Sequence, residues 1–140
     1  MKLIVSKNSG FIILEFFFGM AFGILSVYIF SFYNKFSLFS LILYTFLTIY
    51  ASALFGIGII GFFHLKQNGR VKDFGHAIFY SFIGLIAFLI IYIIINALTF
   101  KLIPYYISSV LLPVILPIIG AVIGFNYKIF KKKMKSIYRK

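Results

Sequence analysis

Four long apolar blocks fill most of this chain and confine nearly all of its charged residues to short segments between or beyond them. The blocks cover residues 11–32, 37–63, 77–100 and 104–125. Each exceeds the roughly 20 residues that an α-helix needs to cross a hydrocarbon core about 30 Å thick. The pattern predicts an all-α integral membrane protein, a four-helix bundle that forms a single domain over residues 1–140.

The composition excludes several other classes. Hydrophobic residues make up 63% of the chain and charged residues 11%, so a water-soluble fold would expose apolar surface almost everywhere. The net charge of +12 comes from bases that flank the apolar blocks, which predicts contact with lipid rather than nucleic acid. The absence of Cys removes thiol nucleophiles, disulfides and thiolate metal ligands. The first block is too long for a cleaved signal peptide, so we expect it to remain as a helix.

The distribution of Lys and Arg predicts the orientation. If the N-terminus is cytoplasmic, twelve of the 14 bases lie on the cytoplasmic side and only Lys35 and Lys101 lie on the other. Cytoplasmic loops of membrane proteins carry such an excess of bases. We therefore expect both termini, and the loop over residues 64–76, in the cytoplasm, with the protein in a bacterial inner membrane.

Small residues recur at helical spacing within the blocks. Helices in lipid associate mainly through close backbone approach and polar contacts, so small residues indicate the faces that pack together. We expect helix packing at seven such positions, Gly19, Gly23, Ser52, Gly56, Gly84, Gly120 and Gly124.

Glu15 is the only acidic residue within an apolar block. A carboxylate in the hydrocarbon region is costly and often serves an ion or proton pathway, although Glu15 is close enough to the start of the block to pair with Lys7 or a base of the loop. Pro113 and Pro117 each remove a backbone hydrogen bond, which predicts a kinked fourth helix. Because broken helices bind ions in some transporters, Glu15, Pro113 and Pro117 are the candidates for transport.

The loop over residues 64–76 contains a turn signal, Asn68-Gly69, and three groups that could ligate a metal, His64, Asp73 and His76. No recognised ligand spacing is matched, and a convincing site supplies three or four convergent ligands. We expect interfacial histidines, no metal and no cofactor.

The tail over residues 127–140 repeats apolar residues at helical spacing among bases, which predicts an amphipathic helix on an anionic leaflet. A solvated flank that only fixes topology and an acidic partner surface are the alternatives. The candidate contacts to lipid headgroups or to a partner are Lys128, Lys131, Lys132, Lys133, Lys135, Arg139 and Lys140.

The layout resembles that of the small multidrug resistance exporters, which are short four-span proteins with one glutamate early in the first helix and a glycine-rich fourth helix. The resemblance implies proton-coupled export of cationic compounds by an antiparallel dimer, and only Glu15 has the position for the glutamate's role. This chain departs from the family in lacking its tryptophan, in a longer and more basic loop and tail, and in a charge bias that opposes dual insertion.

Three functions remain open. The first is a non-enzymatic accessory or scaffold subunit that binds other membrane subunits or its own copies, because packing faces are abundant and no catalytic motif is present. The second is a small proton- or cation-coupled transporter or channel that uses Glu15 and the fourth helix. The third is a holin-like protein that permeabilises the membrane, which toxicity on expression would favour. An enzyme is not expected, because the chain has only two acidic residues and two histidines.

Overall fold

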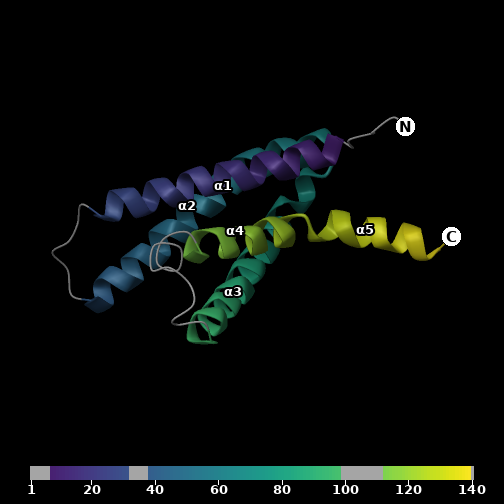
Figure 1. Cartoon of the computed structure of the whole chain (residues 1–140). Coiled ribbons are helices and arrows are strands. Elements are labelled where there is room, and N and C mark those ends of the chain that lie inside the picture. Colours follow the sequence, from purple (N-terminus) through teal and green to yellow (C-terminus); the bar gives the residue numbers. More distant parts are fainter. Residues whose placement is uncertain (1–6, 32–37, 99–111, 140) are drawn as a thin grey trace.

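The computed structural model describes residues 7–31, 38–98 and 112–139. Over these residues the chain is helical, in the order α1 (Lys7–Ser31), α2 (Leu38–Gln67), a short 3-10 turn η1 (Val71–Asp73), α3 (Phe74–Leu98), α4 (Leu112–Phe125) and α5 (Tyr127–Tyr138) (Figure 1). Three helices are long and apolar enough to cross a membrane, or four if α4 and α5 count as one bent span. The expectation of an all-α chain with several helices able to span a membrane is confirmed at this level for the described residues.

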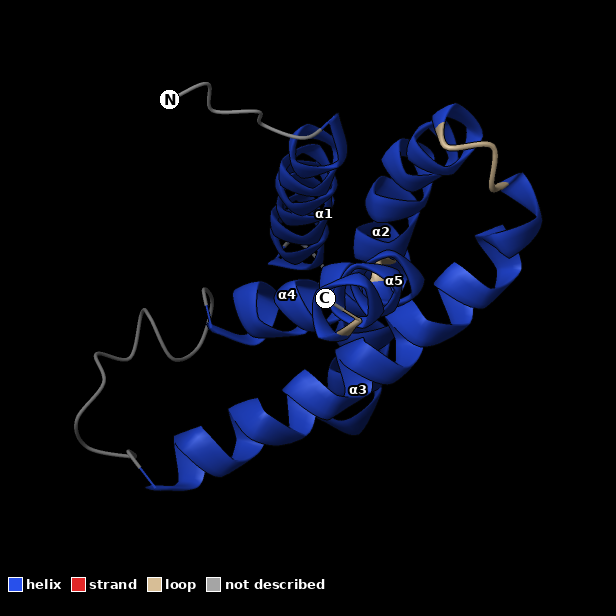
Figure 2. Ribbon diagram, turned by 90° about the vertical axis from the view of Figure 1, so that its right-hand side faces the viewer, coloured by secondary structure: helices blue, strands red, loops and turns tan. Residues whose placement is uncertain are grey.

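The helices form two pairs that meet at α4. α1 packs along α2, and α3 packs along α4. α4 also contacts α1 and α2, so it lies between α3 and the α1–α2 pair (Figure 2). The start of α1, the end of α2, the start of α3 and the whole of α5 lie towards one end of the bundle (Figure 1). We refer to this as the α5 end.

The predicted loop over residues 64–76 is too long, because α2 continues to Gln67 and α3 already begins at Phe74. α2 ends where Gly69 adopts a φ of 65°, a conformation that a residue with a Cβ rarely takes. The amide of Arg70 donates to the Leu65 carbonyl at 2.7 Å, and the amide of Gly69 donates to the Lys66 carbonyl at 3.1 Å. This is a Schellman cap, which satisfies the last carbonyls of the helix. The Asn68-Gly69 turn is therefore where the sequence predicts it, but His64 belongs to the helix.

Close backbone contacts occur at several of the predicted glycines. A Cβ on Gly84 would collide with the Gly120 carbonyl, and a Cβ on Gly124 would collide with the Tyr80 carbonyl. Between α1 and its neighbours, a Cβ on Gly23 would lie 2.8 Å from Val114, and a Cβ on Gly19 would lie 3.1 Å from both Ile57 and Ile118. On α2, a Cβ on Gly56 would lie 2.7 Å from the Phe18 carbonyl, whereas Ser52 is half-buried.

α4 and α5 are separated by a bend of 61° at Asn126. Pro113 lies in the first turn of α4, and Pro117 lies inside that helix with its side chain buried. The first part of the predicted fourth span, residues 104–111, lies outside the described residues, and the kink at Pro113 and Pro117 stays a prediction. The break that the structure does contain follows the last residue of α4.

Candidate functional site: a buried Glu–His–Asn cluster

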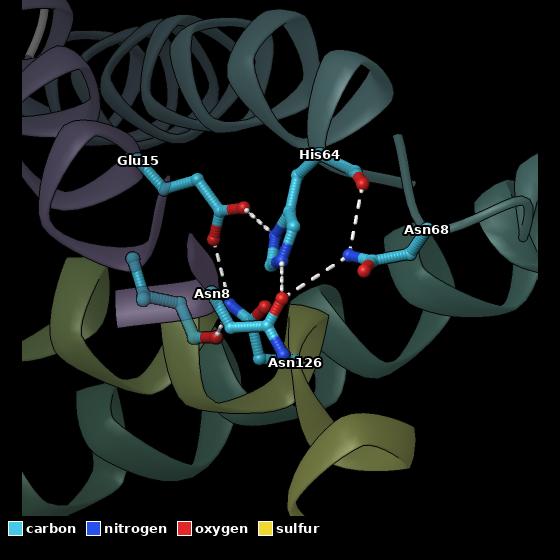
Figure 3. Close-up of polar contacts among 6 residues, drawn as sticks. Asn8, Glu15, His64, Asn68 and Asn126 are labelled. Carbon is cyan, nitrogen blue, oxygen red and sulfur yellow. Dashed lines mark hydrogen bonds and ion pairs between the residues drawn. The ribbon is translucent and has the colours of Figure 1, made fainter. Parts of the chain in front are cut away.

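A cluster of polar side chains lies inside the bundle near the α5 end. Glu15 of α1, His64 of α2 and Asn126 at the end of α4 have no exposed surface. Two hydrogen bonds join them, one at each carboxylate oxygen of Glu15 (Figure 3). The Glu15 Oε1 and His64 Nδ1 atoms are 3.0 Å apart, and the Asn126 amide donates to Glu15 Oε2 at 2.6 Å. The cluster therefore ties together three helices that are far apart in the sequence.

The described partners of Glu15 do not include the expected Lys or Arg of the loop, and the side chain of Lys7, the other expected partner, lies outside the described residues. Glu15 pairs with His64, a residue expected at the interface and found fully buried. The reason is the extra turn of α2, which carries His64 into the bundle opposite Glu15 instead of leaving it in a loop. The ring of Phe11 stacks on the His64 imidazole at a centroid distance of 5.0 Å, so the cluster has an aromatic cover.

Polar side chains surround both ring nitrogens of His64. The Asn68 amide donates to the His64 carbonyl at 3.0 Å, which orients that amide, and it also donates to Asn8 Oδ1 at 3.3 Å. The same Asn8 oxygen lies 3.4 Å from His64 Nε2. On the other side, Nδ1 faces a carboxylate oxygen. Both ring nitrogens of His64 therefore face acceptor oxygens inside the bundle.

Only the amide nitrogen of the Asn126 side chain makes hydrogen bonds. Its amide donates to Glu15 and to the Val122 carbonyl, the latter at 2.9 Å, whereas its Oδ1 is buried without a hydrogen-bond partner. If the amide were turned over, Oδ1 would face the Glu15 oxygen, and two acceptor oxygens would meet without a hydrogen between them when the carboxyl is ionised. A buried acceptor without a donor costs about 1–3 kcal/mol, so Asn126 has been placed at the helix break at a cost in stability.

The other candidates lie apart from this cluster. Along the axis of α4, Pro117 is about 14 Å from Asn126 at the rise of an α-helix. Asp73 receives hydrogen bonds from Lys128 at 2.7 Å and from Arg70 Nε at 3.1 Å, and His76 is exposed. Within the described ranges, no three His, Cys, Asp or Glu side chains are grouped closely enough to hold a metal.

The basic residues of the tail lie in several different surroundings. Lys128 is paired with Asp73, Lys131 lies 5.8 Å from the centre of the Tyr127 ring, and Lys132 and Lys133 line a cleft against α1. Lys135 and Arg139 are exposed. Lys140 lies outside the described residues.

An apolar groove of about 530 Å³ runs between α2 and α3 on the outside of the bundle. Ala51, Phe55, Gly58 and Phe62 line it at helical spacing along α2, and Phe74 and Ile78 line it from α3. Nothing lies within 4 Å of the position that a Cβ would take on Gly58. No lining residue is charged, and none of the other described residues fills this groove.

Sequence reasoning selected Glu15 but missed its partners His64 and Asn126. It also missed Asn8 and Asn68, which contact His64. The Asn68-Gly69 turn, which ends the helix only after His64, is the signal that could have placed His64 on the helix. Nothing in the sequence pattern indicates Asn126. Comparison with protein-family models, with curated proteins and with solved structures found no match to this chain.

Proposed function

We propose that this protein is a non-enzymatic accessory or scaffold subunit of a larger assembly in a bacterial inner membrane, with both termini in the cytoplasm. The observation that carries the proposal is the unfilled groove between α2 and α3. It follows α2 from Ala51 to Phe62, which corresponds to about 16 Å at the rise of an α-helix. That length matches half a membrane span, and the occupant that we propose is a transmembrane helix of a partner subunit.

The use of Glu15 supports the same proposal. Both carboxylate oxygens are engaged by side chains of the chain itself, one by His64 and one by Asn126. A carboxylate that binds a cationic substrate needs at least one accessible oxygen. Complete burial with internal partners is instead what a structural clamp between helices requires.

The test uses Gly58, because a Cβ there would have no atom within 4 Å and a larger side chain would extend into the groove. We expect Gly58→Leu to fold normally but to lose a partner chain that copurifies with the wild type at fixed stoichiometry in native-lipid particles. Gly10→Leu is the matched control, since the space above Gly10 is equally open and Gly10 does not line the groove. A photo-crosslinker at Phe55 should join the partner in the wild type.

The proposal is wrong if wild type, Gly58→Leu and Gly10→Leu all purify as the same isolated chain and the crosslinker reacts only with lipid. The mass of the crosslinked product distinguishes a different subunit from a second copy of this chain.

A second candidate, a proton-coupled transporter, is favoured by one observation. Glu15 Oε1 lies 3.0 Å from His64 Nδ1 inside the bundle, so a second titratable group stands beside the carboxylate. Reconstituted vesicles provide the test. A pH-dependent flux that Glu15→Gln abolishes, while the variant remains folded and inserted, would make this the leading function.

A further inference from the structure

A second hollow lies at the α5 end of the bundle, and its lining differs in kind from that of the apolar groove. This basic cleft has a volume of about 550 Å³ and lies between the start of α1, the segment after α2 and the inner side of α5. Three bases line it, Arg70, Lys132 and Lys133. Asn8, Ser9, Asn68 and Ser136 add hydrogen-bonding groups.

No carboxylate lines the basic cleft. The nearest acidic partner of its bases is Asp73, which is already paired with Lys128 at 2.7 Å. Arg70 directs Nε and one terminal nitrogen at a single oxygen of Asp73, at 3.1 and 3.0 Å. Because a guanidinium has five N–H donors, Arg70 keeps donors for another anion. The cleft therefore has an excess of positive charge that the chain does not neutralise.

The remaining lining residues are apolar. The apolar part of the lining consists of Ile12 from α1 and of Ile129 and Phe130 from α5. A ligand that fits this lining has an anionic group at one end and hydrocarbon at the other. The candidate membrane span of α1 begins at Asn8, which lines the cleft. The start of a span is where lipid headgroups lie.

We propose that the basic cleft binds the phosphate of an anionic phospholipid headgroup. Arg70, Lys132 and Lys133 pair with the phosphate, and Arg70 uses the N–H donors that are not directed at Asp73. Ile12 and Phe130 contact the upper part of the acyl chains. Only two of the exposed bases of α5 belong to this site, and a base outside the tail, Arg70, completes it.

The cleft is also connected to the buried cluster. Asn8 and Asn68, which line it, are the residues that hydrogen-bond to each other and to His64. A lipid in the cleft covers this edge of the cluster and holds α1, the Asn68–Arg70 segment and α5 together. Binding should therefore raise the unfolding temperature, because a ligand that binds only the folded state stabilises it.

The experiment measures lipid binding to the full chain by native mass spectrometry, with phosphatidylglycerol and phosphatidylcholine supplied in equal amounts. We expect the wild type to retain phosphatidylglycerol preferentially. The combined variant Arg70→Gln, Lys132→Gln and Lys133→Gln should weaken that retention at least about tenfold, since each base near an anionic headgroup contributes measurably to binding. Helicity measured by circular dichroism verifies that the variant is folded.

The matched control is Lys131→Gln, Lys135→Gln and Arg139→Gln, which removes the same charge from exposed positions that do not line the cleft. It should retain the preference for phosphatidylglycerol. Equal loss in the two triple variants would show that only the overall charge of the tail matters and would overturn the site. If soluble glycerol phosphate raises the unfolding temperature as much as phosphatidylglycerol does, the ligand is a soluble phosphate ester and the lipid assignment is wrong.

Discussion

Oε1 of Glu15 lies 3.0 Å from Nδ1 of His64, although the two residues are 49 positions apart. Neither has any exposed surface, so the contact joins the first half of α1 to the last turn of α2 inside the bundle. With Asn126 on the other carboxylate oxygen, it makes the α5 end a polar junction of three helices.

The first prediction concerns this pair. Glu15→Gln or His64→Gln should each lower the free energy of unfolding by about 3–5 kcal/mol, because either change leaves a buried polar partner incompletely matched. The double variant should lose less than the sum, with a coupling of about 0.5–3 kcal/mol. Denaturation in a fixed detergent measures all three. His76→Gln is the control and should change stability by less than about 0.5 kcal/mol, because His76 is exposed. Simple additivity of the two single changes would contradict the contact.

The second prediction concerns the contact between α3 and α4. Gly120→Leu should prevent the two helices from approaching, because even a Cβ at this position would collide with the Gly84 carbonyl. We expect loss of the folded protein in detergent or a reduction in stability of several kcal/mol, since overpacking a tight contact costs at least about 1–3 kcal/mol. Ile123→Leu on the exposed face of the same helix is the control. Equal tolerance of both changes would show that the glycine reflects composition only.

The third prediction concerns the end of α2. Gly69→Ala should destabilise the protein by about 1 kcal/mol, because alanine is strained at a φ of 65°. Gly75→Ala should be neutral or slightly stabilising, since the space above Gly75 is open and its φ is not in the left-handed region. Thermal unfolding of both variants provides the comparison. If Gly69→Ala is tolerated as well as Gly75→Ala, the cap does not determine where α2 ends.

The fourth prediction concerns orientation. Reporter fusions after Lys35 and after Lys101 should both read as external, and fusions at either terminus should read as cytoplasmic, because of the distribution of bases. The grouping of the starts of α1 and α3 with α5 at one end of the bundle is compatible with this arrangement (Figure 1). A cytoplasmic signal after either Lys35 or Lys101 would require a different topology and would place the basic cleft away from an anionic leaflet.

Much of the architecture follows from the sequence alone, for a physical reason. In lipid, every backbone polar group must be satisfied within its own segment, so a long apolar run has to be a helix whatever its neighbours are. The same logic identifies Gly84 and Gly120 as contact residues, because close approach of backbones requires small side chains. The Asn68-Gly69 turn is likewise local, since a positive φ favours glycine wherever it occurs.

The partners of Glu15 were decided only by the tertiary structure. A carboxylate in a helix can pair with any polar group that packing brings to it, and sequence distance favoured Lys7 and the bases of the loop. α2 ends only at the Schellman cap at Gly69, so His64 lies in the last turn of the helix and inside the bundle. The packing of α4 against α1 brings Asn126 to the second carboxylate oxygen of Glu15. These contacts depend on how three helices are rotated and offset against one another. Rotation and offset are properties of the packed helices together, and no single segment encodes them.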